Sequence, residues 1–334
     1  MEPLRIVAIG GGTGLSTLLH GLKRYAKDPQ EAEITAVVTV SDDGGSSGRL
    51  RREFEVLPPG DIRNCMVALS EDEGLLSKLF QYRFSSGKGL KGHSFGNLFL
   101  TALTNLTGDF AQAVKVSSEV LASLGRIYPA TDTNVILEAE LENGRIVTGE
   151  SKISKSRSPI KSVRLRPRVC KPLPETLAAI ERADLITFGP GSLFTSVIPN
   201  VLVQGIPQAI RRSRALKAYF VNLMWQPGET IGFRASDHVA ALNRHAGGGL
   251  IDVAVVNTRC ITLRQRRKYE AELAQSVMND VDRLSAMGLQ VVAADLLAEG
   301  EIVRHDSRVA GEIAMDLARR GRANRRKVRV LGEK

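Results

Sequence analysis

The chain has 334 residues, of which 43% are hydrophobic and 25% are charged, a mixture typical of a globular protein with a full core. This composition excludes a disordered chain, a collagen and a disulfide scaffold. Three widely spaced cysteines argue against a cysteine-based metal site, and no apolar run approaches the roughly 20 residues that span a bilayer. We therefore expect a cytoplasmic protein with no membrane span.

The formal net charge of +10 is concentrated in two segments. Residues 151–171 carry +8 and residues 319–334 carry +7, so the rest of the chain must be at −5. Neither segment interleaves aromatic residues with its cations, as a protein that binds single-stranded nucleic acid would. We interpret both segments as solvated charge, expect no nucleic-acid partner, and predict one domain over residues 1–318 followed by a flexible basic tail at 319–334.

The beginning of the chain has the pattern of a βαβ unit. Leu4–Ile9 is an apolar run that meets a glycine-rich turn, a helical pattern of leucines then reaches Leu22, and Ile34–Val40 is a second run rich in β-branched residues. This order predicts a parallel sheet with helices on its faces. Residues 61–82 and 94–124 are expected to be helical, with Asp109 capping the run that follows it.

The middle of the chain predicts an insertion between two α/β halves. An Asn-Gly turn joins two short strands in a hairpin, and the hairpin with the basic segment behind it makes an insertion of about residues 134–171. The second half returns to an α/β pattern. Its expected elements are the strands Leu185–Phe188, Ala218–Leu223 and Ile251–Val256 and a last helix over about 307–320.

Two glycine-rich turns stand where a predicted strand meets a predicted helix, and both are candidate phosphate-binding sites. They consist of Gly10, Gly11, Gly12, Thr13 and Gly14, and of Gly189, Pro190, Gly191 and Ser192. Glycine lets the backbone approach a phosphate, and the free N–H groups of a helix N-terminus attract its charge. The dinucleotide fingerprint fails because its last glycine falls on Leu15, and the Walker A lysine is missing, so a tight turn without a ligand is the alternative. Two such turns would flank the topological switch point of the sheet, where open α/β sheets bind ligands.

Asp42 and Asp43 open a polar loop of glycine and serine behind the second predicted strand. At the carboxyl end of that strand, an acidic side chain can meet a ribose or sugar hydroxyl. The two carboxylates could also hold Mg²⁺, although we expect no metal or other cofactor to be required. The alternative is a solvated loop whose aspartates only start a turn.

Two further helix starts carry polar side chains. Asp61 follows a Pro-Pro-Gly turn and could cap the next helix, whereas Arg63 and Asn64 could reach an anionic ligand. Asn97 offers both a donor and an acceptor to a uracil or sugar edge. His93 is interpreted as a ligand contact or a turn residue, because no other histidine stands at a metal-binding spacing from it.

Six stretches make the sequence similar to the YvcK family, also called the gluconeogenesis factor family, of the CofD-like superfamily over about residues 4–318. They are IVAIGGGTGLSTLLHGLK, AVVTVSDDGGSSGRLR, PPGDIRNCMVALS, GLKGHSFGNLFL, ADLITFGPGSLFTSVIPNVLV and QPGETIGFRASDHV. The resemblance implies a Rossmann-like, three-layer α/β/α fold with a mainly parallel sheet. It also implies a regulator without turnover that binds UDP-N-acetylglucosamine. Such a regulator couples the level of this nucleotide-sugar to cell-wall precursor supply and cell shape, and its partner is glucosamine-6-phosphate synthase or another regulatory protein. We expect a homo-oligomer.

The resemblance also implies which side chains contact the nucleotide-sugar. Two contacts carried over from the family fall on Tyr269 and Arg304, and Arg304 could clamp a diphosphate with two hydrogen bonds. Trp225 stands where the family has a small polar residue, which leaves open the size of the pocket beside it. Besides the two glycine turns, the expected site contains Asp42, Asp43, His93, Asn97, Asn222, Tyr269 and Arg304.

The alternative function is the enzyme of the same superfamily, a Mg²⁺-dependent transferase that moves a phospholactyl-type group from a nucleotide-activated donor to a deazaflavin. Asp42 and Asp43 would then hold the metal. The first two matching stretches follow the regulator's pattern, and an aromatic content of 5% leaves few rings to sandwich a flavin-like group. A basic module associated with nucleic acid is a third hypothesis, under which binding would weaken steeply with salt and depend on residues 319–334.

Overall fold

The computed structural model describes residues 2–71, 74–156, 158–270 and 274–332. Within these residues the centre is a seven-stranded sheet in the order β10-β9-β8-β7-β1-β2-β3, and each neighbouring pair is parallel. Its strands are β1 (Leu4–Gly10), β2 (Ala32–Val38), β3 (Arg126–Pro129), β7 (Leu185–Phe188), β8 (Leu216–Phe220), β9 (Val253–Asn257) and β10 (Gln290–Ala294). The strand order reverses between β1 and β7, which is the topological switch point of the sheet.

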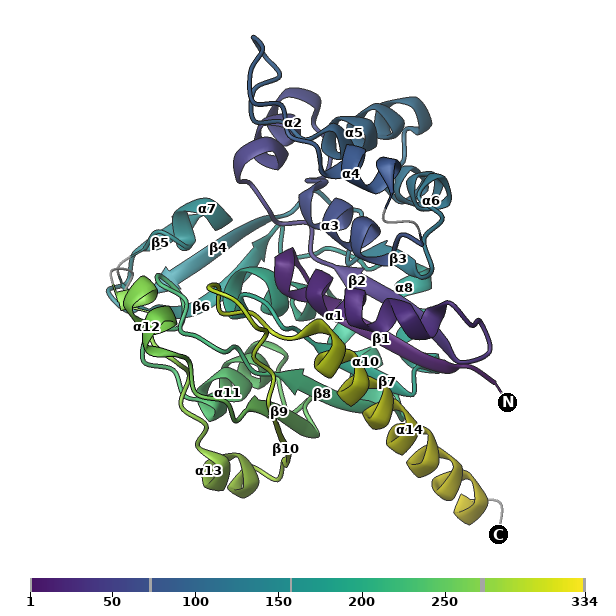
Figure 1. The fold of residues 1–334 in the computed structure, drawn as a ribbon, viewed down its shortest axis with the longest axis vertical. Coiled ribbons are helices and arrows are strands. Elements are labelled where there is room, and N and C mark those ends of the chain that lie inside the picture. The colour runs from purple at the N-terminus through teal and green to yellow at the C-terminus, as the bar shows by residue number, and fades with distance from the viewer. Residues whose placement is uncertain (1, 72–73, 157, 271–273, 333–334) are drawn as a thin grey trace.

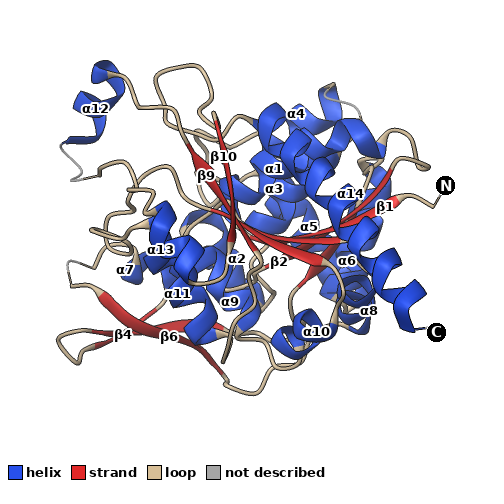
Figure 2. Cartoon of the chain, turned by 90° about the horizontal axis from the view of Figure 1, so that it is seen from below, coloured by secondary structure: helices blue, strands red, loops and turns tan. Residues whose placement is uncertain are grey.

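Helices cover both faces of this sheet, as the edge-on view in Figure 2 shows. One face carries α1 (Gly12–Ala26), α3 (Gly60–Leu69) and α14 (Ser307–Gly332). The other carries α8 (Pro174–Arg182), the π-helical turn Leu193–Val197 with α9 (Ile198–Val201), α10 (Ile206–Arg212) and α11 (Ala235–His245). The predicted three-layer α/β/α fold with a mainly parallel sheet is therefore confirmed.

Further helices extend the two ends of the sheet (Figure 1). A group beyond β2 and β3 contains α2 (Gly45–Phe54), α4 (Leu75–Gln81), α5 (Phe95–Thr107) and α6 (Phe110–Val120), whereas α12 (Leu263–Glu270) and α13 (Val281–Ala286) belong to the β9–β10 end. The segments expected to be helical at 61–82 and 94–124 each contain two helices, α3 and α4 in the first and α5 and α6 in the second. Asp109 caps α6 as predicted, because its Oδ1 accepts the N–H groups of Ala111 and Gln112 at 2.8 and 3.3 Å.

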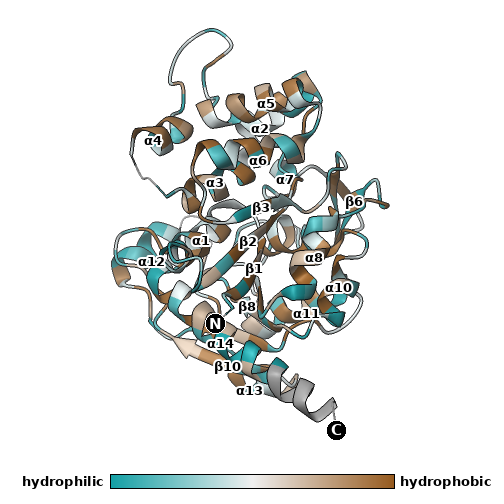
Figure 3. Ribbon diagram, turned by 90° about the vertical axis from the view of Figure 1, so that its right-hand side faces the viewer, coloured by the Kyte–Doolittle hydropathy of each residue, from teal (hydrophilic) through white to brown (hydrophobic). Residues whose placement is uncertain are grey.

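The central strands are apolar along most of their length because helices bury them from both sides. In each of the strands β1 and β2 all residues but one are buried. Figure 3 shows these strands as a mainly hydrophobic band in the middle of the molecule. This continuous pattern made β1 and β2 visible in the sequence. The short edge strand β3, with four residues, gave no such signal and was missed.

The expected hairpin is present in a separate three-stranded antiparallel sheet. Its order is β5-β4-β6, with β4 (Ile136–Leu141), β5 (Ile146–Thr148) and β6 (Ile160–Arg166), and the four-residue helix α7 (Glu150–Ile153) joins β5 to β6. The basic segment is therefore in part a strand rather than a solvated arm. Arg164 and Arg166 of β6 both pair with Glu138 of β4, and Lys161 pairs with Glu140, so facing carboxylates neutralise part of its charge.

The last helix crosses residue 318 without a break, so the first part of the predicted flexible tail is helical. α14 lies against α1 so closely that a Cβ on Gly21 would overlap the backbone of Ser307. Arg322 and Arg325 both pair with the buried carboxylate of Asp184, which ties this part of the helix to the sheet. None of the described helices is alone long and apolar enough to cross a membrane. The bent pair Leu193–Val201 and Ile206–Arg212 together reaches that length and apolar composition.

Candidate functional site

The two glycine turns predicted from the sequence meet at the switch point. β1 and β7 are neighbours in the sheet, so the turns that follow them lie side by side. A Cβ on Gly14 would overlap the carbonyl group of Pro190, and a Cβ on Gly191 would lie 3.3 Å from the carbonyl oxygen of Gly11. Glycine is needed here because the two backbones pack directly against each other. The result is an exposed N-terminus of α1 at the carboxyl edge of the sheet, which favours an anion.

A cavity of about 330 Å³ opens in front of these turns. Gly11, Gly12, Thr13 and Gly14 line one side of it, and Gly191, Ser192 and Asn222 line the other. Asn222 Nδ2 donates to Gln226 Oε1 at 2.9 Å, and Gln226 Nε2 donates to Ser192 Oγ at 2.6 Å. This chain of neutral donors and acceptors is suited to hydroxyl and amide groups of a ligand.

Trp225 does not reduce the cavity beside Asn222. Its indole Nε1 donates to the Phe233 carbonyl oxygen at 2.9 Å, and the ring packs against the core instead of lining the cavity. Asn222, Leu223, Met224 and Gln226 are the cavity-lining residues of this segment. The question that the sequence left open at Trp225 is therefore answered by the direction of its side chain.

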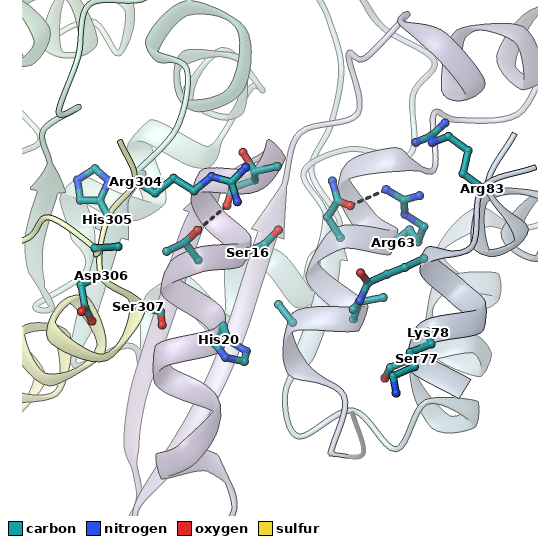
Figure 4. Close-up of a pocket in the computed structure, with 17 residues that line it drawn as sticks. Ser16, His20, Arg63, Ser77, Lys78, Arg83, Arg304, His305, Asp306 and Ser307 are labelled. Atoms are coloured by element: carbon teal, nitrogen blue, oxygen red, sulfur yellow. Dashed lines mark hydrogen bonds between the residues drawn. The ribbon is translucent and has the colours of Figure 1, made fainter. Parts of the chain in front are cut away.

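Arg304 and Tyr269 occupy different places. Arg304 is exposed and lines the cavity, and Figure 4 shows its side chain directed toward the N-terminus of α1. Tyr269 in α12 does not line the cavity, but its hydroxyl accepts the N–H of Val303 at 3.1 Å. Tyr269 therefore holds the backbone next to Arg304, and it acts on the cavity through that loop.

Buried carboxylates stand behind the first glycine turn. Asp61 does not cap α3; it accepts the Gly12 N–H, and a Cβ on Gly11 would lie 2.6 Å from its Oδ2. Complete burial, with the nearby charge of Asp42, raises the pKa of Asp61 to about 7. Glu150 lines the cavity, its buried Oε2 has no hydrogen-bond partner among the described residues, and burial and nearby carboxylates raise its pKa well above the usual value.

Asp42 and Asp43 face different parts of the molecule. Asp42 Oδ1 accepts the Gly44 N–H at 2.8 Å, and burial raises the pKa of this carboxyl group. Asp43 Oδ1 accepts the Ser151 N–H at 2.8 Å and so holds the small sheet in place. No group of three or more acidic, histidine or cysteine side chains among the residues with described positions is arranged to hold a metal ion. Mg²⁺ is often held by only one or two carboxylates together with water and substrate phosphates, so a magnesium site at Asp42 and Asp43 stays a prediction.

His93 and Asn97 are buried and share one partner. His93 Nδ1 lies 2.9 Å from Ser46 Oγ, and Asn97 Nδ2 donates to the same oxygen at 3.1 Å. The Oδ1 of Asn97 is buried and has no hydrogen-bond partner in the described part of the chain. The neighbouring Ser47 hydrogen-bonds Asp42. The structure thus connects His93 and Asn97 with the Asp42 loop, but neither side chain lines the cavity in front of the glycine turns.

Sequence reasoning missed Gln226, Glu150 and His305 as site residues. All three line the cavity. Gln226 lies four residues after Asn222, which follows β8, and this position at the carboxyl edge of the sheet could have identified it. Glu150 comes from the insertion and gave no such signal. His305 donates from Nε2 to the Val221 carbonyl oxygen at 3.2 Å, and burial lowers its pKa to about 4, so the ring is neutral near pH 7.

Comparison with known proteins places these features in a family. A family model described as 2-phospho-L-lactate transferase CofD matches residues 6–297. The gluconeogenesis factor of Bacillus subtilis is 49% identical over 314 residues, which cover 94% of this chain and 98% of that protein. The chain belongs to the gluconeogenesis factors of the CofD family.

Solved and curated relatives agree with this assignment. A crystal structure of a UPF0052-family protein from Bacillus halodurans is 48% identical, with a TM-score of 0.90, and the match covers 94% of this chain and 100% of that chain. A putative gluconeogenesis factor of Thermotoga maritima is 48% identical over 308 residues, which cover 91% of this chain and 96% of that protein. In each of these comparisons the similarity therefore extends over nearly the whole of this chain and of its relative.

Proposed function

We propose that this CofD-family chain is a regulatory protein that binds UDP-N-acetylglucosamine in the cavity at the switch point. The observation that carries the proposal is that one cavity combines a phosphate-type helix N-terminus with a neutral hydrogen-bond network. The diphosphate would face the first glycine turn and Arg304. Ser192, Asn222 and Gln226 would bind the polar groups of the uridine or the sugar.

The same arrangement suggests how binding could reach the surface. Arg304 sits in a loop that is fastened to α12, because Tyr269 accepts the Val303 N–H, Gln265 donates to the Gly300 carbonyl oxygen at 2.9 Å, and Arg264 pairs with Glu301. A ligand that engages Arg304 would stabilise one position of this loop and of α12. The segment 265–305 also includes residues 271–273, which lie outside the described residues.

The proposed role is to report the level of nucleotide-sugar to other proteins. The partner would be glucosamine-6-phosphate synthase or another regulatory protein, and the outputs would be cell-wall precursor supply and cell shape in the cytoplasm. A homo-oligomeric state is part of this proposal. The names of the relatives as gluconeogenesis factors support a role in metabolic regulation rather than in one catalytic step.

A Mg²⁺-dependent transferase is the second candidate, and the carboxylates behind the glycine turn favour it. The family model carries the name of such a transferase, and the carboxyl groups are close together: Asp42 raises the pKa of Asp61, and both raise the pKa of Glu150. Against it, no Phe, Tyr or Trp among the described residues lines the cavity, so a flavin-like acceptor would lack a stacking partner there.

Calorimetric titration tests the proposal directly. The purified protein is titrated with UDP-N-acetylglucosamine, with and without Mg²⁺, and with UDP, GTP and NAD as competitors. We expect uridine-selective binding without product formation. Arg304→Ala should weaken binding at least tenfold, because a cation leaves the diphosphate, whereas Arg308→Ala on the exposed face of α14 should bind as the wild type does. If the UDP-sugar does not bind and a guanine nucleotide binds in a Mg²⁺-dependent way, the result would favour the transferase.

A further inference from the structure

A second and larger cleft of about 850 Å³ extends over α1, with lining residues on both sides of that helix (Figure 4). It is bounded by α1, α3, α4 and the residues that precede α14. The side chains that define it are Thr13, Ser16, Thr17, His20, Arg63, Asn64, Ser77, Lys78, Gln81, Arg83, Arg304, His305 and Asp306. Its volume lies in the range of small-molecule sites in proteins.

The lining of this cleft carries four cationic side chains and one carboxylate, so its charge is strongly positive. Arg63, Lys78, Arg83 and Arg304 all line it, and no carboxylate of the described residues forms an ion pair with any of them. Asp306 is the acidic residue in the lining, and its Oδ1 accepts the Val309 N–H at 3.0 Å at the start of α14. A cluster of cations of this kind is stabilised when an anion enters it.

Two of the arginines are held by hydrogen bonds to neighbouring oxygens of the protein. Arg63 Nη2 donates to Asn64 Oδ1 at 2.6 Å, and Arg83 Nη1 donates to the Gly92 carbonyl oxygen at 2.6 Å. The Nε of Arg63 is buried and has no hydrogen-bond partner in the described part of the structure. Burial and the repulsion from the charge of Arg83 lower the pKa of Arg63, whereas the nearby carboxyl groups of Asp61 and Asp42 offset part of this effect. An anion between the two guanidinium groups would satisfy both of them.

The rest of the lining indicates what the anion is attached to. Hydroxyl and amide side chains such as Thr13, Ser16, Thr17 and Gln81 belong to the same lining, and its apolar side chains are Val67, Ala68 and Ala298. Such a lining suits a molecule rich in hydroxyl groups rather than an aromatic ring. We propose that this cleft binds a phosphorylated small molecule of the sugar phosphate class, with Arg63, Arg83 and Lys78 on its phosphate, as a ligand separate from the nucleotide-sugar.

The phosphate could come from two sources, because the cleft and the smaller cavity share Thr13, Thr17, Arg304 and His305. It could belong to a second ligand, or it could be the diphosphate of a nucleotide-sugar that extends past Arg304. Arg63, Lys78 and Arg83 line the cleft but not the smaller cavity, so their removal distinguishes a site of its own from the nucleotide site. Three cations outside the lining that the two cavities share favour the second ligand.

Glucose 6-phosphate is the probe, with glucose as its uncharged control. Its affinity for the full chain is measured by calorimetry for the wild type, Arg83→Gln, Lys78→Gln and Arg63→Gln. Arg52→Gln removes an exposed arginine of α2 that lines neither cavity, and it serves as the matched control. We expect binding of the probe but not of glucose, a loss of about tenfold for Arg83→Gln and for Arg63→Gln, and no change for Arg52→Gln. Arg83 is exposed, so its variant should fold even where the packing of Arg63 against Gly96 makes Arg63→Gln unstable.

Titration of the probe at rising UDP-N-acetylglucosamine concentration identifies the source of the phosphate. For separate sites, the apparent dissociation constant of the probe levels off once the nucleotide-sugar is saturating. A constant that rises without limit would overturn the proposal, because both ligands would then compete for one site. Equal affinity of Arg83→Gln, Arg63→Gln and the wild type for the probe, or no binding of the probe to the wild type, would also overturn it. The titrations with glucose 6-phosphate alone contain no nucleotide-sugar. Their result therefore tests this proposal even if the protein does not bind UDP-N-acetylglucosamine.

Discussion

The two sides of the switch point present different groups to the cavity. On the β1–β2 side, the glycine turn is backed by the buried carboxyl groups of Asp42 and Asp61, with Glu150 at the cavity wall. On the β7–β8 side, the wall is the neutral network of Ser192 and Gln226, and the buried carboxyl group behind it, Glu229, accepts the Phe194 N–H and the Thr195 hydroxyl. The neutral side can bind polar ligand groups without a charge penalty. The acidic side tolerates a nearby phosphate only when its carboxyl groups are protonated or neutralised by a cation.

The largest effect that sharpens this comparison is expected at Asp61. Its folded pKa is about 7, so between about pH 4 and pH 7 the folded state keeps a proton that the unfolded state has lost. The contribution of Asp61 to the stability of the wild type therefore falls as the pH rises through this window, by up to about 4 kcal/mol. Asp61→Asn keeps an oxygen acceptor for the Gly12 N–H and has no charge. Urea unfolding at pH 5 and pH 8 should show a stability advantage of the variant that grows with pH.

The difference between the two proteins reports Asp61 together with its effect on Glu150, whose pKa the charge of Asp61 raises. Both keep His305, whose lowered pKa acts on stability in the opposite direction, so its contribution cancels in the comparison. A stability difference that is the same at pH 5 and pH 8 would mean that Asp61 is ionised in the folded protein. The acidic side would then carry a permanent negative charge.

The contact between the two glycine turns gives the second test of this comparison. Gly14→Ala introduces a Cβ that overlaps the Pro190 carbonyl group, so the turns must separate. We expect a loss of about 1–3 kcal/mol in the free energy of unfolding, as for other overpacked sites, and weaker binding of the nucleotide-sugar. Gly249→Ala is the control, because a Cβ there meets open space. Equal stability of the two variants in urea unfolding would show that the turns do not pack as described.

A smaller effect is expected on the neutral side. Gln226→Ala removes the link between Asn222 and Ser192, and we expect the affinity for UDP-N-acetylglucosamine to fall about fivefold, the value of one lost hydrogen bond near 1 kcal/mol. Gln208→Ala on the exposed side of α10 is the matched control. Calorimetry compares the affinities of the two variants for UDP-N-acetylglucosamine. An unchanged affinity in the Gln226 variant would place the ligand away from this network.

The sequence revealed the parts of the molecule that depend on local pattern. The apolar runs of β1 and β2, the glycines at the ends of β1 and β7, and the capping by Asp109 all follow from rules that act over a few residues. The family resemblance added the location of Arg304. These signals were enough to place the switch point and both glycine turns.

Long-range packing accounts for what the sequence did not show. Asp61 looks like a helix cap, yet it faces Gly12 because α3 packs against α1, and this contact joins residues far apart in the chain. Glu150 reaches the cavity from the insertion, whose position depends on how the small sheet docks through Asp43. The tail was expected to be flexible because its charge is high, but Asp184 supplies a buried partner for Arg322 and Arg325.

The most direct test measures the affinity for UDP-N-acetylglucosamine at pH 6 and pH 8, without metal, for the wild type and Asp61→Asn. A diphosphate at the first glycine turn would lie in front of Asp61, so ionisation of that carboxyl group should weaken binding. The account predicts that the wild type binds several-fold more tightly at pH 6 than at pH 8, and that this difference disappears in the variant. Equal affinity of the wild type at both pH values would contradict a diphosphate at this turn, and so would a pH difference that the variant retains.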